Sequence, residues 1–167
     1  MREQLTESDV KKIQEEIDHR KLVVRKEAIE AVKEARAQGD LSENFEYYAA
    51  KKDKNRNESR IRYLENMLKH AKIVSDQSNA DEIGLNDTVT LYFEDDEEDE
   101  VYRLVTSIRG NSLKNLISIE SPIGKAILGH KEGEKVLVKV NDSYSYELII
   151  RKIEQTQDDS EDQIRAF

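Results

Sequence analysis

Two carboxylate side chains, Asp40 and Glu43, are the residues of this sequence best suited to do chemistry. They lie three positions apart, directly after Gly39, in a segment that separates two long amphipathic stretches. Carboxylate oxygens suit Mg²⁺, but this ion demands octahedral geometry, keeps several waters, and takes one or two carboxylates together with substrate phosphates. The pair would therefore supply half of a site. A macromolecular partner that already holds a metal ion and a phosphodiester would complete it, with a second ion helping to activate water.

A purely structural role for the same pair stays open. Asp40 at a helix N-cap, with Glu43 three residues later, has the pattern of a capping box. In that motif the two side chains satisfy backbone N–H groups at the start of a helix, which requires no further function.

A basic stretch follows the acidic pair. Residues 47–72 contain eight basic and three acidic side chains. Such a stretch is either a solvated helix face with salt-bridged neighbours or a strip that neutralises RNA phosphates, where Arg36, Lys51 and Lys52 would lie closest to the turn. Tyr47 and Tyr48 would either pack between helices or stack on a base.

Other kinds of chemistry find little support in the sequence. There is no cysteine, and the three histidines are scattered without the spacing of metal ligands. No nucleophile motif such as G-x-S-x-G is present. The N-terminal residues lack an apolar stretch of signal-peptide length, and nowhere do about 18 apolar residues run together, so we expect a cytoplasmic protein without a membrane or small-molecule partner.

Two long helices should position the acidic pair. Apolar residues follow helical steps at Ile13, Ile17, Val24 and Ala31, after which the apolar seam shifts to 28, 32 and 35. A second seam runs through residues 47, 50, 61, 64, 68 and 71. A short connection forces two such helices to be antiparallel, so residues 1–76 are predicted to form a coiled-coil hairpin with its tip at 39–46.

The second half of the chain has a different pattern. Alternation around Val89, Leu137 and Tyr144 predicts strands, and an apolar stretch after Pro122 predicts one short helix. The fold class is therefore α+β, with a small antiparallel sheet domain at 81–154, an exposed acidic loop at 94–100 and a polar, disordered tail at 155–167. The net charge is −9 for the whole chain and concentrates in this half, which disfavours direct DNA binding.

Three segments resemble one known family. Residues 35–51 look like the tip segment of Gre transcript-elongation factors, and residues 58–65 with 71–74 resemble the second helix of that family. Residues 117–129 are similar to the signature of its C-terminal domain, whose fold resembles that of the FK506-binding prolyl isomerases. The three sequences, in chain order, are ARAQGDLSENFEYYAAK, ESRIRYLE with AKIV, and ISIESPIGKAILG.

The resemblance implies a bacterial elongation factor that is not itself an enzyme. The hairpin would enter the secondary channel of RNA polymerase, where Asp40 and Glu43 would help to hold the second Mg²⁺ of the polymerase site while backtracked nascent RNA is cleaved. The isolated chain would bind no cofactor. The resemblance further implies that the 3′ end of the RNA, or the polymerase around it, contacts Arg36, Ser42, Asn44, Glu46, Tyr47, Lys51 and Lys52. Ser121, Pro122, Ile123 and Gly124 would anchor the sheet domain to polymerase.

Departures from the family pattern keep an alternative open. Phe45 stands where the family usually has a small residue, residues 107–112 lack the usual acidic pattern, and the acidic loop is dense. The chain could thus be a paralogue that binds the channel and modulates polymerase without promoting cleavage. A prolyl-isomerase activity is disfavoured, because it needs an aromatic-lined pocket and residues 81–154 contain one phenylalanine, four tyrosines and no tryptophan.

Overall fold

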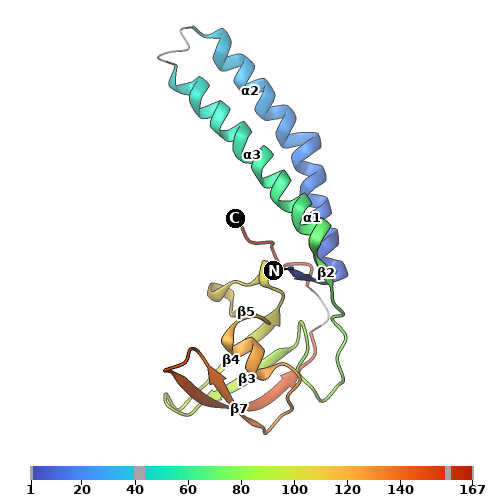
Figure 1. Ribbon diagram of the computed structural model, residues 1–167, viewed down its shortest axis with the longest axis vertical. Coiled ribbons are helices and arrows are strands. Elements are labelled where there is room, and N and C mark those ends of the chain that lie inside the picture. The colour runs from blue at the N-terminus through green and yellow to red at the C-terminus, as the bar shows by residue number, and fades with distance from the viewer. Residues whose placement is uncertain (1, 40–43, 157–158, 167) are drawn as a thin grey trace. The chain divides into compact units, whose positions relative to one another are not determined.

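The computed structural model describes residues 2–39, 44–156 and 159–166 (Figure 1). The chain divides into two compact units, one built around Asp9–Ala71 and the other from Lys72–Ala166 together with Gln4–Ser8. The sequence had suggested a first domain of 1–76. The segment before the first helix joins the second unit because β1 (Gln4–Leu5) pairs in parallel with β2 (Lys72–Ile73), which follows the last long helix.

Two antiparallel helical arms form the hairpin, as the apolar spacing predicted. The first arm is continuous but contains a π-helical turn, and the second is a single α-helix about 39 Å long at 1.5 Å per residue. In chain order the elements are α1 (Glu7–His19), the π turn η1 (Arg20–Val24), α2 (Arg25–Ala37) and α3 (Phe45–His70).

The π turn explains why the apolar seam of the first arm changes phase. The backbone N–H of Arg25 donates to the carbonyl of Arg20, five residues earlier, and the side-chain amide of Asn57 donates to the same carbonyl at 3.2 Å. When a side chain inserts among the backbone hydrogen bonds of a helix in this way, that turn accommodates one extra residue. Ile17 before the turn and Ala35 after it are both buried, whereas Ala31, which the seven-residue step from Val24 placed in the seam, is exposed.

Charged and polar side chains fill the middle of the seam. Arg60 is 4 % exposed and donates from Nε and Nη2 to the carboxylate of Glu16 at 2.8 and 3.2 Å. Arg20 bonds the same carboxylate at 2.7 Å and also donates to Asn57 Oδ1 at 3.0 Å. Burial raises the pKa of Glu16, but the two guanidinium groups outweigh burial and leave that pKa below its ordinary value.

Five strands form the sheet of the second unit, in the order β5-β4-β3-β7-β6 (Figure 1). The expected antiparallel pairing holds except at one edge, where β5 runs parallel to β4. The chain reaches β5 through two short 3₁₀ turns rather than a tight hairpin. As a result β5 runs in the same direction as β4 instead of opposite to it. The strands are β3 (Thr88–Phe93), β4 (Glu98–Val105), β5 (Leu116–Ser118), β6 (Lys135–Lys139) and β7 (Ser145–Glu154), and the turns are η2 (Ser107–Arg109) and η3 (Ser112–Lys114).

One face of this sheet carries the core. Alternate residues from each strand are buried with the short helix α4 (Pro122–Ile127), whose Ile127 is fully inaccessible. The acidic segment 94–100 is exposed but is not entirely a loop, because β4 begins at Glu98. The remaining core residues are Ile83, Leu85, Val89, Leu91, Leu104, Ile119, Val136, Val138, Leu148 and Ile150.

An arginine cluster under the chain end was not foreseen. Arg109 is 1 % exposed and donates from Nη1 to Asn86 Oδ1 at 2.7 Å and to Asp162 Oδ2 at 2.8 Å. Arg103 is ion-paired with the other oxygen of Asp162. Burial raises the pKa of Asp162, yet these two arginines outweigh burial and bring that pKa below its ordinary value.

The polar tail was expected to be disordered, but residues 159–166 contact the second unit. The backbone N–H of Arg165 donates to the carbonyl of Ile108 at 2.8 Å, and Asp159 accepts a hydrogen bond from Ser8 at 3.0 Å. A buried guanidinium needs a counterion, because transfer of an unpaired charge out of water is costly. The tail carboxylates meet that need, which composition alone does not reveal.

Removing the carboxylate of the seam should destabilise the hairpin. We expect Glu16→Gln to lower the free energy of unfolding by about 2 kcal/mol, because the buried Arg60 loses the carboxylate charge of Glu16, which is itself 24 % exposed. Since the folded pKa of Glu16 lies below 4.5, its contribution is complete above that pH and is lost as the pH falls through the folded value. Urea unfolding followed by circular dichroism at neutral and acidic pH measures both effects.

The control is an exposed ion pair in the same hairpin. Lys21 and Glu65 lie 3.0 Å apart with about half of each side chain exposed, so Glu65→Gln should change the unfolding free energy by no more than about 0.5 kcal/mol. Equal losses for Glu16→Gln and Glu65→Gln, or a Glu16 effect that persists unchanged in acid, would contradict the assignment.

Candidate functional site at the hairpin turn

Asn44 starts α3 and ties the two arms together. Its Oδ1 accepts from the backbone N–H of Tyr47 at 3.0 Å, and its Nδ2 donates to the carbonyl of Ala35 at 2.6 Å. The helix therefore has Asn44 as its N-cap. The capping box considered for Asp40 and Glu43 lies outside the described residues. Asn44 was predicted to contact polymerase or RNA, but in this structure both its polar atoms bond within the hairpin.

The first arm ends at Gly39. Its φ of 138° lies in a region that residues with a side chain rarely adopt, so this position favours glycine. Gln38 closes the last turn by donating from its N–H to the carbonyl of Ala35 at 3.3 Å. Three predicted site residues, Asp40, Ser42 and Glu43, fall between Gly39 and Asn44 and lie outside the described residues.

Aromatic and basic side chains flank the turn. Arg36 lies over the ring of Tyr47, 5.6 Å from its centroid, and donates to the Tyr47 hydroxyl at 3.5 Å. This hydrogen bond, together with the charges of nearby lysines, lowers the pKa of Tyr47 below its ordinary value. The Tyr48 ring packs edge-on against Tyr47 at 5.5 Å, and Phe45 is 86 % exposed. Arg36 and Tyr47, both predicted site residues, are thus in contact across the hairpin.

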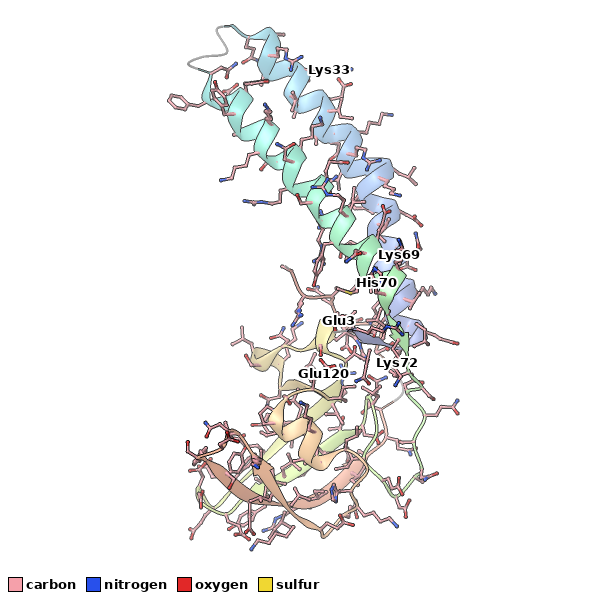
Figure 2. The ribbon with its side chains drawn as sticks, viewed as in Figure 1. Glu3, Lys33, Lys69, His70, Lys72 and Glu120 are labelled. Atoms are coloured by element: carbon pink, nitrogen blue, oxygen red, sulfur yellow. The ribbon has the colours of Figure 1, made fainter. Side chains whose placement is uncertain are left out.

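The basic strip of α3 is real but smaller than its sequence suggested. Lys51 and Lys52 are exposed, as is Glu46 beside them. Lys69, at the far end of the helix, is exposed as well (Figure 2). Arg60, which the sequence placed in the strip, instead turns into the seam. Sequence reasoning missed this arrangement because nothing local distinguishes a buried arginine from a solvated one.

The motif 121–124 builds the start of α4. Ser121 is the N-cap, and its Oγ accepts from the N–H of Gly124 at 3.0 Å and donates to the carbonyl of Ser118 at 2.6 Å. A Cβ on Gly124 would lie 2.0 Å from that carbonyl oxygen, so glycine is required here. Pro122 occupies the first turn and is exposed, whereas Ile123 is half-buried against the core. The predicted anchoring residues therefore form one rigid corner.

Metal-binding groups do not gather elsewhere in the described ranges. Among residues 2–39, 44–156 and 159–166, no three His, Asp or Glu side chains are placed to hold one ion. No helix in this part of the chain is long and apolar enough to cross a membrane.

A two-helix hairpin with a basic second arm, followed by a small mixed sheet with one short helix, is the architecture expected of a Gre-type transcription factor. Two family profiles match the chain, described as transcription elongation factor, N-terminal (residues 3–73), and transcription elongation factor, GreA/GreB, C-term (residues 77–155). The chain therefore belongs to the GreA/GreB family of transcription elongation factors.

Individual relatives are similar over most of their length. Transcription elongation factor GreA of Caldanaerobacter subterraneus is 44 % identical over 137 residues, which cover 81 % of this chain and 87 % of that protein. GreA of Streptococcus gordonii is 40 % identical over 153 residues, or 91 % and 95 % of the two chains. A solved structure of the transcription factor Gfh1 is 27 % identical, covers 92 % of this chain and 97 % of its own, and superposes with a TM-score of 0.45.

The Asn44 cap gives a test of how the turn is held. We expect Asn44→Ala to destabilise the start of α3 by about 1 kcal/mol, because the Tyr47 amide loses its acceptor and Ala35 loses its donor. Hydrogen exchange of the amides of residues 45–49 measures the local opening. Asn44→Asp keeps the acceptor but loses the donor, so it should restore most of the protection of the Tyr47 amide. Unchanged exchange in Asn44→Ala would contradict the cap.

Proposed function

We propose that this protein binds RNA polymerase in the cytoplasm, inserts its hairpin into the secondary channel and stimulates the polymerase to cleave backtracked nascent RNA. In this role it is an activator rather than an enzyme. The observation that carries the proposal is the position of Asp40 and Glu43 in the sequence, between Gly39, which follows α2, and Asn44, which caps α3.

The cap assignment supports a chemical role for the carboxylates. Because Asn44 accepts from the amide of Tyr47, this amide does not need Asp40 as its acceptor. Asp40 and Glu43 would then be available to a partner.

The donor set fits a shared Mg²⁺ but not a private one. Two carboxylates supply at most a few of the six oxygen ligands that Mg²⁺ requires. Asp40 and Glu43 would hold the ion together with groups of the polymerase and the RNA. Mg²⁺ held there would supply a coordinated water of lowered pKa as the nucleophile for phosphodiester hydrolysis.

The slender shape of the hairpin and its positive charge near the turn suit a narrow channel that contains RNA phosphates. Two helices, each about 10 to 12 Å in diameter, form a slender projection. Because ion pairs fill part of the interface between them, no further helix or sheet has to cover it. Close to the turn, the hydrogen bond from Arg36 and the positive charges of Lys51 and Lys54 lower the pKa of Tyr47, so this part of the hairpin is positively charged. That charge would attract the phosphates of an extruded RNA end.

The corner at 121–124 is suited to anchoring. Its backbone is fixed by the Ser121 cap and by the close approach of Gly124 to Ser118, while Pro122 stays exposed. Glu120, labelled in Figure 2, accepts a hydrogen bond from Ser107 at 2.8 Å and so secures the approach to this corner. A rigid exposed corner loses little entropy when a partner docks on it.

The carboxylates should be essential for cleavage and dispensable for binding. We expect Asp40→Asn and Glu43→Gln each to slow RNA cleavage in halted, backtracked complexes by about 100-fold or more, because several kcal/mol of charge stabilisation are lost. Gel analysis of labelled transcripts measures the rate, and competition with labelled wild-type protein measures polymerase binding. Glu27→Gln/Glu30→Gln, which removes two exposed carboxylates from α2, is the control and should cleave at the wild-type rate.

Binding to polymerase without acceleration of cleavage, in wild type and variants alike, would contradict the proposal. That result would favour the alternative of a channel-binding modulator. No binding to polymerase at all would reject both functions.

The lysines behind the turn should contribute through charge. We expect Lys51→Ala/Lys52→Ala to weaken binding to backtracked complexes several-fold and to reduce the slope of log affinity against log salt by about 1 to 2, as for the loss of one or two phosphate contacts. Lys26→Ala/Lys33→Ala removes two exposed charges from α2 and should leave the slope nearly unchanged. If both double variants gave the same slope of log affinity against log salt, the RNA phosphates would not be contacted by Lys51 and Lys52.

A further inference from the structure

Four aromatic rings form a continuous row across three neighbouring strands of the second unit. Tyr102 of β4 lies 6.4 Å from Phe93 of β3, measured between ring centroids, and Phe93 lies 6.1 Å from Tyr146 of β7. Tyr144, just before β7, continues the row at 6.0 Å. The strands β4, β3 and β7 are direct neighbours in the sheet, so the row runs across the strands rather than along one of them (Figure 1).

This aromatic row is the uncovered end of the core face. Phe93 continues the alternation of the buried residues Val89 and Leu91, and Tyr146 stands two residues before the buried Leu148. The rings of Phe93, Tyr102 and Tyr146 are half-buried against the core, whereas Tyr144 is 55 % exposed. The core face therefore ends in a strip of rings that solvent or a partner can reach.

Two carboxylates lie on the same face as the rings. Glu98 pairs directly with Phe93 across the β3–β4 ladder, and Glu100 pairs with Leu91, so both side chains point to the core side of the sheet. Glu100 accepts a hydrogen bond from the Tyr102 hydroxyl. Burial and this carboxylate raise the pKa of Tyr102 to about 12, and burial, Tyr144 and Glu100 raise that of Tyr146. The negative charge of Glu100 thus acts along the row.

The opposite face of the same strands shows how this protein neutralises such a pair. There Tyr92 is the cross-strand partner of Asp99, and Arg151 of β7 lies over the Tyr92 ring at 4.2 Å while its Nε pairs with Asp99 at 3.1 Å. A guanidinium thereby stacks on an aromatic ring and bonds the adjacent carboxylate, an arrangement that combines cation–π attraction with an ion pair.

The aromatic row has the ring and the carboxylates but no cation. Within the described ranges, no Lys, Arg or His nitrogen lies within ion-pair distance of Glu98 or Glu100. By contrast, the side-chain nitrogen of Lys135 lies 3.1 Å from the carboxylate of Glu94 and 3.0 Å from that of Glu147. Exposed acidic and aromatic groups placed together form a surface complementary to a cation.

We infer that the aromatic row, with Glu98 and Glu100, is a docking surface for a basic, arginine-bearing segment of a partner protein. A guanidinium would lie on the exposed rings and bond the two carboxylates, in the manner of Arg151 on the other face. Nucleic acid is disfavoured as the occupant because its phosphates would meet seven acidic residues in succession at 94–100. The inference does not rest on the cleavage proposal, because it concerns a different unit of the chain.

Binding of a fluorescein-labelled hexa-arginine peptide to the full-length chain tests this surface. Fluorescence anisotropy at physiological salt should give saturable binding. The affinity should fall about fivefold in Tyr144→Ala and, in a separate variant, about fivefold in Glu98→Gln/Glu100→Gln. The matched control, Asp95→Asn/Asp96→Asn, removes the same charge from the turn of the same hairpin and should change the affinity less than twofold. Circular dichroism melting of each variant establishes that it is folded.

Equal weakening in the two double variants would overturn the inference, because the peptide would then respond to net charge alone. Binding that is unaffected by Tyr144→Ala would overturn it as well, since the rings would take no part. Sedimentation of the chain without peptide provides a further check. Self-association that Glu98→Gln/Glu100→Gln abolishes would identify a second copy, with its basic α3, as the occupant in place of a different protein.

Discussion

The hairpin depends on polar and charged side chains that pair across the buried interface between its two arms. An antiparallel pair of helices has one interface, and here its middle is occupied by Glu16 with Arg60 and by Arg20 with Asn57. These groups satisfy one another in a single register, because sliding one arm by a turn would leave a buried guanidinium without its anion. The register in turn brings Asn44 opposite the carbonyl of Ala35 and so determines how the arms close at the turn.

Periodicity was sufficient to predict the arms but not what lies between them. The apolar steps at Ile13, Ile17, Ile61 and Leu64 are local, and all four side chains are buried as expected. The burial of Arg60 could not be read in the same way, because its partner is 44 residues away and either residue alone resembles a solvated helix position. Pairing of charges is a tertiary property that a single sequence does not display.

The candidate site was predicted in part for the same reason. Glycine after the first arm and an acidic pair following it are local signals, and they predicted the tip at 39–46, whereas α2 ends at Ala37 and α3 already begins at Phe45. From the sequence, Asp40 was considered as an N-cap and Asn44 was not, although the structure shows Asn44 to be the N-cap of α3. The side-chain amide of Asn44 also reaches the preceding arm, a contact that capping rules do not consider.

The sheet domain illustrates the limit of alternation. Strands near residues 89, 137 and 145 were foreseen, but the phase of β6 was not, since Val136 and Val138 are buried while Leu137 is 57 % exposed. The parallel edge and the burial of Arg109 beneath Asp162 depend on segments brought together by the fold. An arginine in a short turn and an aspartate in a polar tail carry no mark that they will meet.

The π turn also bears on how the hairpin tolerates changes in chain length. Each residue of an α-helix advances the side chains by about 100°, so one deleted residue in α2 would swing Ala35 away from Asn44 and misalign everything beyond it. At Arg20–Val24 the helix already holds one residue more than a regular turn. A deletion there would relax the bulge into ordinary helix and leave the side chains on both sides facing the seam as before. Length variation in this arm is thus tolerated at a single turn and restrained outside it.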